Sequence, residues 1–136
     1  MVFKTNIQIR FSDCDMLNHV NNAVYLQYFE TARVEFFNKE LRGWDWNTNG
    51  IILAKNIVDY LKPVYLNDTC YIALTCTKIG NASFTLAYQL MVVESGIETV
   101  KAQGESVLVC FDFKTKQTEL IPKNLLRVLE KYKAKV

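Results

Sequence analysis

The spacing at which apolar and polar side chains alternate changes along this sequence, and each spacing predicts a strand or a helix. Residues 2–12 alternate in character with few breakers, which predicts a first strand. Residues 23–41 repeat at three- and four-residue steps and predict a long helix. Apolar side chains cover most of this helix outside one polar stripe, so other elements must wrap around it. The stripe consists of Gln27, Thr31, Glu35 and Asn38.

After Gly50 the alternation has a period of two and predicts β-structure as far as residue 113. Short turns separate the alternating runs, so neighbouring strands are expected to be antiparallel. A short final helix is predicted over 121–132, with Pro122 in its first turn. The sum is an α+β chain in which a five-stranded antiparallel sheet curves around the long helix, the plan of the hotdog fold. The four later strands are predicted over residues 51–61, 70–79, 84–93 and 99–113.

The loop between the first strand and the long helix concentrates the polar chemistry of the chain. It holds Asp13, Asp15 and the only histidine, His19. Free backbone N–H groups and the positive end of the dipole collect at a helix start, and Asn21 or Asn22 is suited to cap them. Carboxylates beside such a start can act on a carbonyl group that the N–H groups polarise. We therefore expect this loop to be an acyl-transfer site.

Composition narrows the class of protein. The 136 residues are expected to form one domain over 1–136, with half of them hydrophobic and 22% charged. A net charge of +2 does not favour a nucleic-acid partner, and the lysines at 131, 133 and 135 are expected to be a solvated, fraying tail. No apolar run approaches the roughly 20 residues of a membrane span, and the N-terminus lacks the form of a signal peptide. The four cysteines form no CxxC pair, which favours a reducing, cytoplasmic setting.

The loop and the helix start resemble a known family. The segments Asp13-Cys-Asp15, His19-Val-Asn-Asn22 and Phe29-Glu-Thr-Ala-Arg33, together with Tyr25, are similar to motifs of the 4-hydroxybenzoyl-CoA thioesterase family of hotdog acyl-CoA thioesterases. The His-Val-Asn-Asn form is also similar to thioesterases that act on fatty acyl chains, including the plant acyl-carrier-protein enzymes, so the acyl group stays open. The likeness extends over nearly the whole chain, through residues 59–63, 67–68, 80–84 and 121–122.

This resemblance implies a set of roles. Asp15 would be the catalytic carboxylate, and the backbone N–H near Asn22 would bind the oxyanion. The substrate would be an acyl-CoA, with no metal and no cofactor beyond the coenzyme A of the substrate. The chain would form a homodimer or homotetramer with active sites between subunits, and the unpaired edges of a single sheet favour such self-association independently. The contacts to coenzyme A would come from Lys78, Asn81 and Ser83.

Several roles stay open on the residues alone. Asp15 can attack the thioester carbonyl or deprotonate a water molecule. His19 can orient that water, contact the acyl group, or only bond the loop backbone. Asp13 is expected to hold the loop, and a metal bound by Asp13, Asp15 and His19 is disfavoured because a helix start suits a carbonyl oxygen better than a cation. Tyr25 is expected to line the acyl pocket, and Cys14, between two acids, is not expected to be a nucleophile.

The function expected from these observations is hydrolysis of an acyl-CoA thioester to a free acid and coenzyme A. One alternative keeps the reaction but makes the substrate an acyl-carrier-protein thioester, which matched substrate pairs would distinguish. The other is a non-catalytic acyl-CoA-binding module, which would bind acyl-CoA without releasing thiol. The acyl group and the choice between dimer and tetramer are not readable from the alternation of side chains.

Overall fold

The computed structural model describes residues 1–135 and has the predicted hotdog architecture, a curved antiparallel sheet with a long helix across it. The strand order is β1-β3-β4-β5-β2, and a sixth strand, β6, pairs with β5. The long helix and the four later strands begin and end within two residues of the predicted positions. The elements are β1 (Phe3–Ile7), η1 (Phe11–Asp13), α1 (Val24–Glu40), β2 (Asn49–Tyr60), β3 (Thr69–Ile79), β4 (Ser83–Glu94), β5 (Ile97–Asp112), β6 (Gln117–Thr118) and α2 (Lys123–Lys131).

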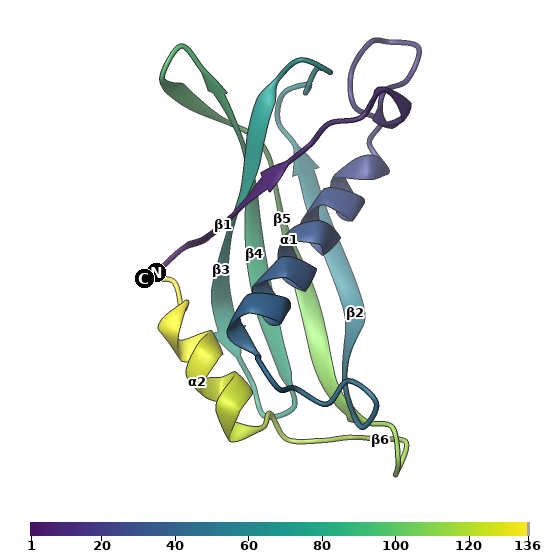
Figure 1. The fold of residues 1–136 in the computed structure, drawn as a ribbon, viewed down its shortest axis with the longest axis vertical. Coiled ribbons are helices and arrows are strands. Elements are labelled where there is room, and N and C mark those ends of the chain that lie inside the picture. Colours follow the sequence, from purple (N-terminus) through teal and green to yellow (C-terminus); the bar gives the residue numbers. More distant parts are fainter. Residues whose placement is uncertain (136) are drawn as a thin grey trace.

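One face of the sheet packs against α1, as Figure 1 shows. The alternation of β4 decides which face this is, because every second side chain from Phe84 to Val92 is buried. The ring of Phe29 on α1 stacks on Tyr88 of β4, with 4.6 Å between centroids and 7° between planes. Gly104 on β5 makes this close approach possible, since a Cβ at that position would lie 2.7 Å from the Phe29 ring. The buried side chains of β4 are Phe84, Thr85, Leu86, Tyr88, Leu90 and Val92.

The first strand is shorter than predicted. β1 ends at Ile7, whereas the alternation suggested a strand to residue 12. The reason lies in the register, because Ile7 pairs with Cys70 and β3 extends only one residue further, to Thr69. The chain then turns into η1, which leaves Phe11 with 85% of its surface exposed.

The start of α1 and the tail after α2 differ from the sequence-based expectation. The N-cap position of α1 is Ala23, not Asn21 or Asn22, although the side-chain oxygen of Asn21 accepts the Ala23 N–H at 3.0 Å. The C-terminal lysines are exposed, but the tail up to residue 134 is not frayed. The N–H of Ala134 donates to the carbonyl oxygen of Cys76 at 2.8 Å, which ties the tail to β3.

One edge of the sheet, strand β2, is largely exposed. β2 is an edge strand of 12 residues that pairs only with β5 on the path of the sheet. Many of its side chains are exposed, including Ile52, Leu53 and Ile57 at 41–45%. Across residues 1–135, neither helix combines the length and the apolar character that crossing a membrane requires.

Candidate active site

Residues 13–21 form a small hairpin between η1 and α1. The N–H of Asp15 donates to the carbonyl oxygen of His19 at 3.1 Å, and the N–H of Asn21 donates to that of Asp13 at 2.9 Å. These two bonds set the register of the hairpin. Asp15 therefore lies toward the hairpin tip, and the chain leaves the hairpin base directly into α1.

The hairpin is anchored on two sides. The N–H of the fully buried Val20 donates to the Val64 carbonyl oxygen at 2.7 Å, which connects the hairpin to the segment leading into β3. The hydroxyl of Tyr28 donates to Asp13 Oδ2 at 2.6 Å, and the same oxygen accepts the Arg10 N–H at 2.9 Å. Burial, this bond and the negative charge of Asp13 raise the pKa of Tyr28 well above its usual range. Asp13 thus holds the loop, as the sequence predicts, and it also ties the loop to α1.

Asp15 keeps part of its carboxylate free. Its Oδ1 accepts the Leu17 N–H at 2.9 Å, and the side chain is 30% exposed. Within the described residues, no hydrogen bond uses its Oδ2. The Nδ1 atom of His19 lies 3.9 Å from Asp15 Oδ1 and 3.4 Å from the Val20 carbonyl oxygen. This position is compatible with both roles left open for His19, as a neighbour of the carboxylate and as a loop residue bonded to backbone.

The start of α1 presents a free backbone donor. The N–H of Ala23 donates to the Asn21 side chain and that of Val24 to the Asn21 carbonyl oxygen. The N–H of Asn22 between them has no acceptor among residues 1–135. The Asn22 N–H belongs to the Asn21–Asn22 peptide, which is held because its carbonyl oxygen accepts the Val24 N–H at 2.9 Å. The Tyr60 hydroxyl donates at 2.8 Å to the carbonyl oxygen of the next peptide, at Asn22, and fixes the start of α1 against the end of β2. A fixed peptide with an unused N–H is the type of group that can bind an oxyanion.

A pocket of about 340 Å³ opens beside Asp15. It has apolar and polar walls from η1, the hairpin and the segment before β3. Tyr65 in this wall forms an isolated antiparallel β-bridge with His19 through the backbone and is 46% exposed. A carboxylate with one free oxygen therefore faces a cavity large enough for a small reacting group. The lining residues are Phe11, Cys14, Asp15, Asn18, Tyr65, Leu66 and Asn67.

Cys14 lines the same pocket, but its thiol is poorly suited to act as a nucleophile. Burial and the charges of Asp13 and Asp15 raise the pKa of its thiol, which disfavours the thiolate as the sequence predicts. Tyr25 lies elsewhere: it is 2% exposed and packs edge-to-face on Tyr60 with centroids 5.0 Å apart. Tyr25 does not line the pocket beside Asp15, and its expected contact with an acyl group stays a prediction.

The residues expected to contact coenzyme A lie at the other end of the sheet. Asp15 is close to the segment before β3, while Lys78, Asn81 and Ser83 surround the turn after β3. The 11 residues of β3 separate the two sets, which corresponds to roughly 35 Å at the rise of an extended strand. Figure 1 shows the loop at one end of α1 and the β3–β4 turn at the other, near α2. One chain therefore does not bring these residues and Asp15 into a common site.

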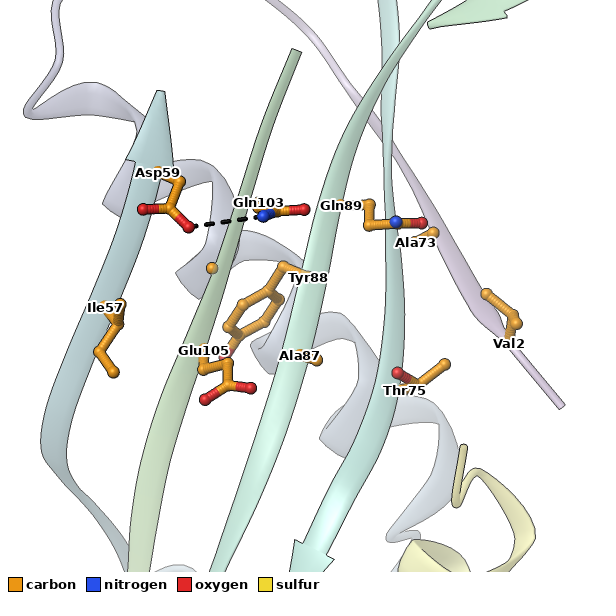
Figure 2. A pocket seen from close by; sticks show the side chains of 11 residues that line it. Val2, Ile57, Asp59, Ala73, Thr75, Ala87, Tyr88, Gln89, Gln103 and Glu105 are labelled. Carbon is orange, nitrogen blue, oxygen red and sulfur yellow. Dashed lines mark hydrogen bonds between the residues drawn. The ribbon is translucent and has the colours of Figure 1, made fainter. Parts of the chain in front are cut away.

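A further hollow, of about 440 Å³, lies on the sheet rather than in the loop. Its lining comes from β2, β3, β4 and β5 and from Val2, and Figure 2 shows the hydrogen bond from Gln103 to Asp59, which is 3.4 Å long. Ala87 and Gln89 belong to the face of β4 that alternates with the buried one, so the hollow faces away from α1. None of the expected site residues lines it.

No three His, Cys, Asp or Glu side chains converge as a metal site within residues 1–135. The expectation that catalysis needs no metal and no added cofactor stays a prediction.

Sequence reasoning missed three tyrosines around the site. None of the three was given a role at the site, yet the Tyr28 hydroxyl holds Asp13, the Tyr60 hydroxyl bonds the Asn22 carbonyl oxygen, and Tyr65 lines the pocket beside Asp15. A signal existed for Tyr28, because it lies one turn after Tyr25 near the start of α1 and a buried phenol needs a polar partner. The other two depend on how the end of β2 and the next loop meet the hairpin, which local sequence does not encode.

Comparison with known proteins places these observations in a family. The long-chain acyl-CoA thioesterase FadM of Escherichia coli is 29% identical over 129 residues, covering 93% of this chain and 96% of that protein. The uncharacterized protein YsmA of Bacillus subtilis is 30% identical over 86 residues, but the match spans only 58% of its length and 63% of this chain.

Among solved structures, a thioesterase of Thermus thermophilus determined with coenzyme A and zinc is 28% identical, with a TM-score of 0.78. The match covers 93% of this chain and 95% of that one. The family model described as the thioesterase-like superfamily matches residues 9–129, which include the hairpin, α1 and the strands from β2 onward. This chain therefore belongs to the thioesterase-like superfamily, a family of thioester hydrolases.

Proposed function

We propose that this protein hydrolyses acyl-CoA thioesters, with the hairpin and the start of α1 as its active site. The observation that carries the proposal is the pairing of a carboxylate with a free oxygen, Asp15, and an unused helix-start N–H, at Asn22. Asp15 is paired with His19 across the hairpin, and Asn22 follows His19 by three residues, roughly 10 Å at the rise of an extended chain. An aspartate side chain, a thioester carbonyl and one hydrogen bond can bridge such a distance.

In this proposal the thioester oxygen accepts the Asn22 N–H, and negative charge grows on that oxygen as the carbonyl is attacked. A single preorganised donor of this kind lowers the barrier by about 3 kcal/mol. The bond from the Val24 N–H to the Asn21 carbonyl oxygen supports the role, since it holds the peptide that carries this donor, and the Tyr60 bond holds the adjoining peptide. Asp15 either attacks the carbonyl and forms a mixed anhydride, which water then hydrolyses to the free acid and Asp15, or removes a proton from a water that attacks the carbonyl directly. In both routes the C–S bond breaks and coenzyme A leaves as the thiol.

His19 acts beside Asp15 in the proposal. Its imidazole lies close enough to the carboxylate to hold it or to orient the water. Neither function requires the histidine to be charged, and its long contacts allow the ring to adjust when substrate enters.

The coenzyme A portion is assigned to the β3–β4 turn of a second copy of the chain. Lys78, Asn81 and Ser83 lie too far from Asp15 to serve the same site within one chain, so they can act only across an interface. The exposed edge of β2 supports self-association, because an unpaired strand of this length is suited to pair with another. The similar Thermus thermophilus thioesterase was determined with coenzyme A, and FadM is named as a long-chain acyl-CoA thioesterase.

Thiol release across a panel of acyl-CoAs tests this proposal. The panel runs from short aliphatic through long-chain to aromatic acyl groups, and each is compared with the matching acyl-carrier-protein thioester. Turnover of at least one acyl-CoA class is expected. Turnover of carrier-protein thioesters alone would support the alternative substrate, and saturable acyl-CoA binding without thiol release across the panel would support the binding module instead.

A further inference from the structure

A second pocket, of about 420 Å³, lies between α1 and the edge strand β2. We name it the α1–β2 pocket. Its walls are mainly apolar, and the Trp46, Val34 and Leu53 side chains at its border are 41–49% exposed. No residue is shared with the pocket beside Asp15. The lining consists of Glu30, Arg33, Val34, Phe37, Asn38, Trp46, Ile51, Leu53 and Leu108.

The unusual member of this lining is Arg33, which is only 8% exposed. Its Nη1 donates to the Tyr88 hydroxyl at 3.4 Å, and its Nη2 lies 3.5 Å from a carboxylate oxygen of Glu30. Both contacts are long, and a guanidinium has five N–H donors. Within residues 1–135 these are its only polar partners from side chains. A charged group held out of water with so few partners is costly unless something else pairs with it.

Glu30 is a weak partner for this cation. Its side chain is 66% exposed, so solvent screens the ion pair and the carboxylate is free to move. The side chain of Arg33 itself is only 10% exposed, so little of the guanidinium is open to solvent. The pocket therefore combines apolar walls with a buried donor, which is the pattern of a small-molecule site with one orienting polar group.

Both α1 and β2 extend from the proposed reaction site to the α1–β2 pocket. β2 runs beside α1, with Tyr60 bonded to Asn22 at one end and Ile51 near Phe37 at the other. Arg33 is eleven residues after Asn22 along the chain, most of them in α1. At the rise of a helix this separation is roughly 16 Å, comparable to a medium-length extended acyl chain.

We propose that the α1–β2 pocket receives the far end of the acyl group and that Arg33 selects acyl groups carrying an acceptor oxygen there. This inference rests on the proposed function, since it names the substrate class of that reaction. The shared chemistry is an oxygen that accepts from the guanidinium, from either a carboxylate or a hydroxyl group. A carboxylate would take both η nitrogens and displace Glu30, whereas a hydroxyl would accept from Arg33 and donate to Glu30.

The experiment compares kcat/KM for lauroyl-CoA, its omega-hydroxy derivative and its omega-carboxy derivative. For each derivative the readout is a selectivity ratio, its kcat/KM divided by that for lauroyl-CoA. Arg33→Met keeps the length of the side chain and removes the charge. The ratio is expected to fall about 10- to 100-fold for the preferred derivative, the range for losing a charge-assisted hydrogen bond in a buried site.

Two further variants sharpen the test. Lys39→Met removes a cation from α1 outside the pocket, where the lysine pairs with Glu35 and is 62% exposed, so it is expected to leave both ratios unchanged. Glu30→Gln removes the competing carboxylate and is expected to raise the omega-carboxy ratio several-fold if that derivative is the preferred one. Should Arg33→Met fail to fold, Glu30→Gln must still change the ratio of at least one derivative.

The outcomes separate this inference from the proposed function. An Arg33-dependent advantage for one derivative supports the inference and identifies which oxygen is recognised. Equal ratios in wild type and Arg33→Met, with normal hydrolysis of lauroyl-CoA, would overturn the inference and leave the hydrolase intact. A change of oligomeric state in Arg33→Met without a change of ratio would overturn it as well, because the pocket would then be a contact between copies. No hydrolysis of any acyl-CoA by wild type would refute both.

Discussion

Replacing Tyr28 with phenylalanine tests how the active-site loop is held. The substitution removes one hydroxyl, which is 2.6 Å from Asp13 Oδ2, on a side chain that is 6% exposed. A hydrogen bond to a charged group contributes about 1.5–3 kcal/mol to the free energy of unfolding. Each kcal/mol shifts Tm by roughly 4 °C in a domain of this size, so we expect a drop of roughly 6–12 °C.

The kinetic effect is expected to be a separate observable. Loosening Asp13 loosens the hairpin that carries Asp15, so kcat should fall about tenfold or more while the far end of the sheet is unaffected. Thermal unfolding followed by circular dichroism gives the first quantity, and thiol release gives the second.

Tyr71, on the face of β3 that points away from the core, provides a matched control. Tyr71→Phe removes the same hydroxyl from an exposed pair, in which Tyr71 donates to Glu98 at 2.9 Å. This variant is expected to stay within about 0.5 kcal/mol of wild type and to keep full activity. If Tyr28→Phe were as stable and as active as Tyr71→Phe, the idea that Asp13 and Tyr28 hold the loop would be wrong.

Two predictions concern the fold itself. In Gly104→Ala the new Cβ would lie 2.6 Å from the Ile57 carbonyl oxygen and 2.7 Å from the Phe29 ring. The free energy of unfolding in urea should therefore fall by about 1–3 kcal/mol. An unchanged urea midpoint would contradict this close packing. Burial raises the pKa of the Cys70 thiol to about 11, and burial with the bond to a carboxylate raises that of Tyr132 to about 12. The folded protein thus keeps protons that the unfolded chain loses above about pH 8.5 for cysteine and pH 10 for tyrosine. The free energy of unfolding should be level below about pH 8 and should fall progressively as pH rises toward 11 and 12. A level profile through pH 11 would show that these groups are not shielded.

The fold was largely predictable because apolar side chains recur at regular spacing in its strands and in its long helix. The alternation from Cys70 to Val93 and the wide apolar arc of α1 both correspond to the buried faces. Residues 8–12 were assigned wrongly because alternation alone cannot show that β3 extends only one residue beyond the partner of Ile7. Strand pairing is a non-local property, and the end of a strand depends on its neighbour as much as on its own residues.

The site was predictable in part, and for a similar reason. The hairpin residues are close in sequence, so the motif around Asp15 indicated a single loop, and the structure has one. The groups that hold it come from distant segments, as with Tyr60 from β2 and Tyr28 from α1. Arg33 illustrates the same limit, because its position on a helix reads as one polar interruption of an apolar face, and only packing against Tyr88 reveals that it is buried.

The most direct test of the central claim is the kcat of Asp15→Asn on a good acyl-CoA substrate. Asp15 accepts the N–H two residues ahead, and an asparagine oxygen can accept it equally, so the turn and the fold should survive. Asp45 makes the same type of turn with Asn47 at 3.0 Å, and Asp45→Asn is the matched control. If Asp15 is the catalytic carboxylate, kcat should fall about 10²- to 10⁴-fold with Tm unchanged, while Asp45→Asn stays at wild-type rate. An Asp15→Asn variant with wild-type kcat would show that Asp15 only shapes the turn, and it would contradict the proposed mechanism.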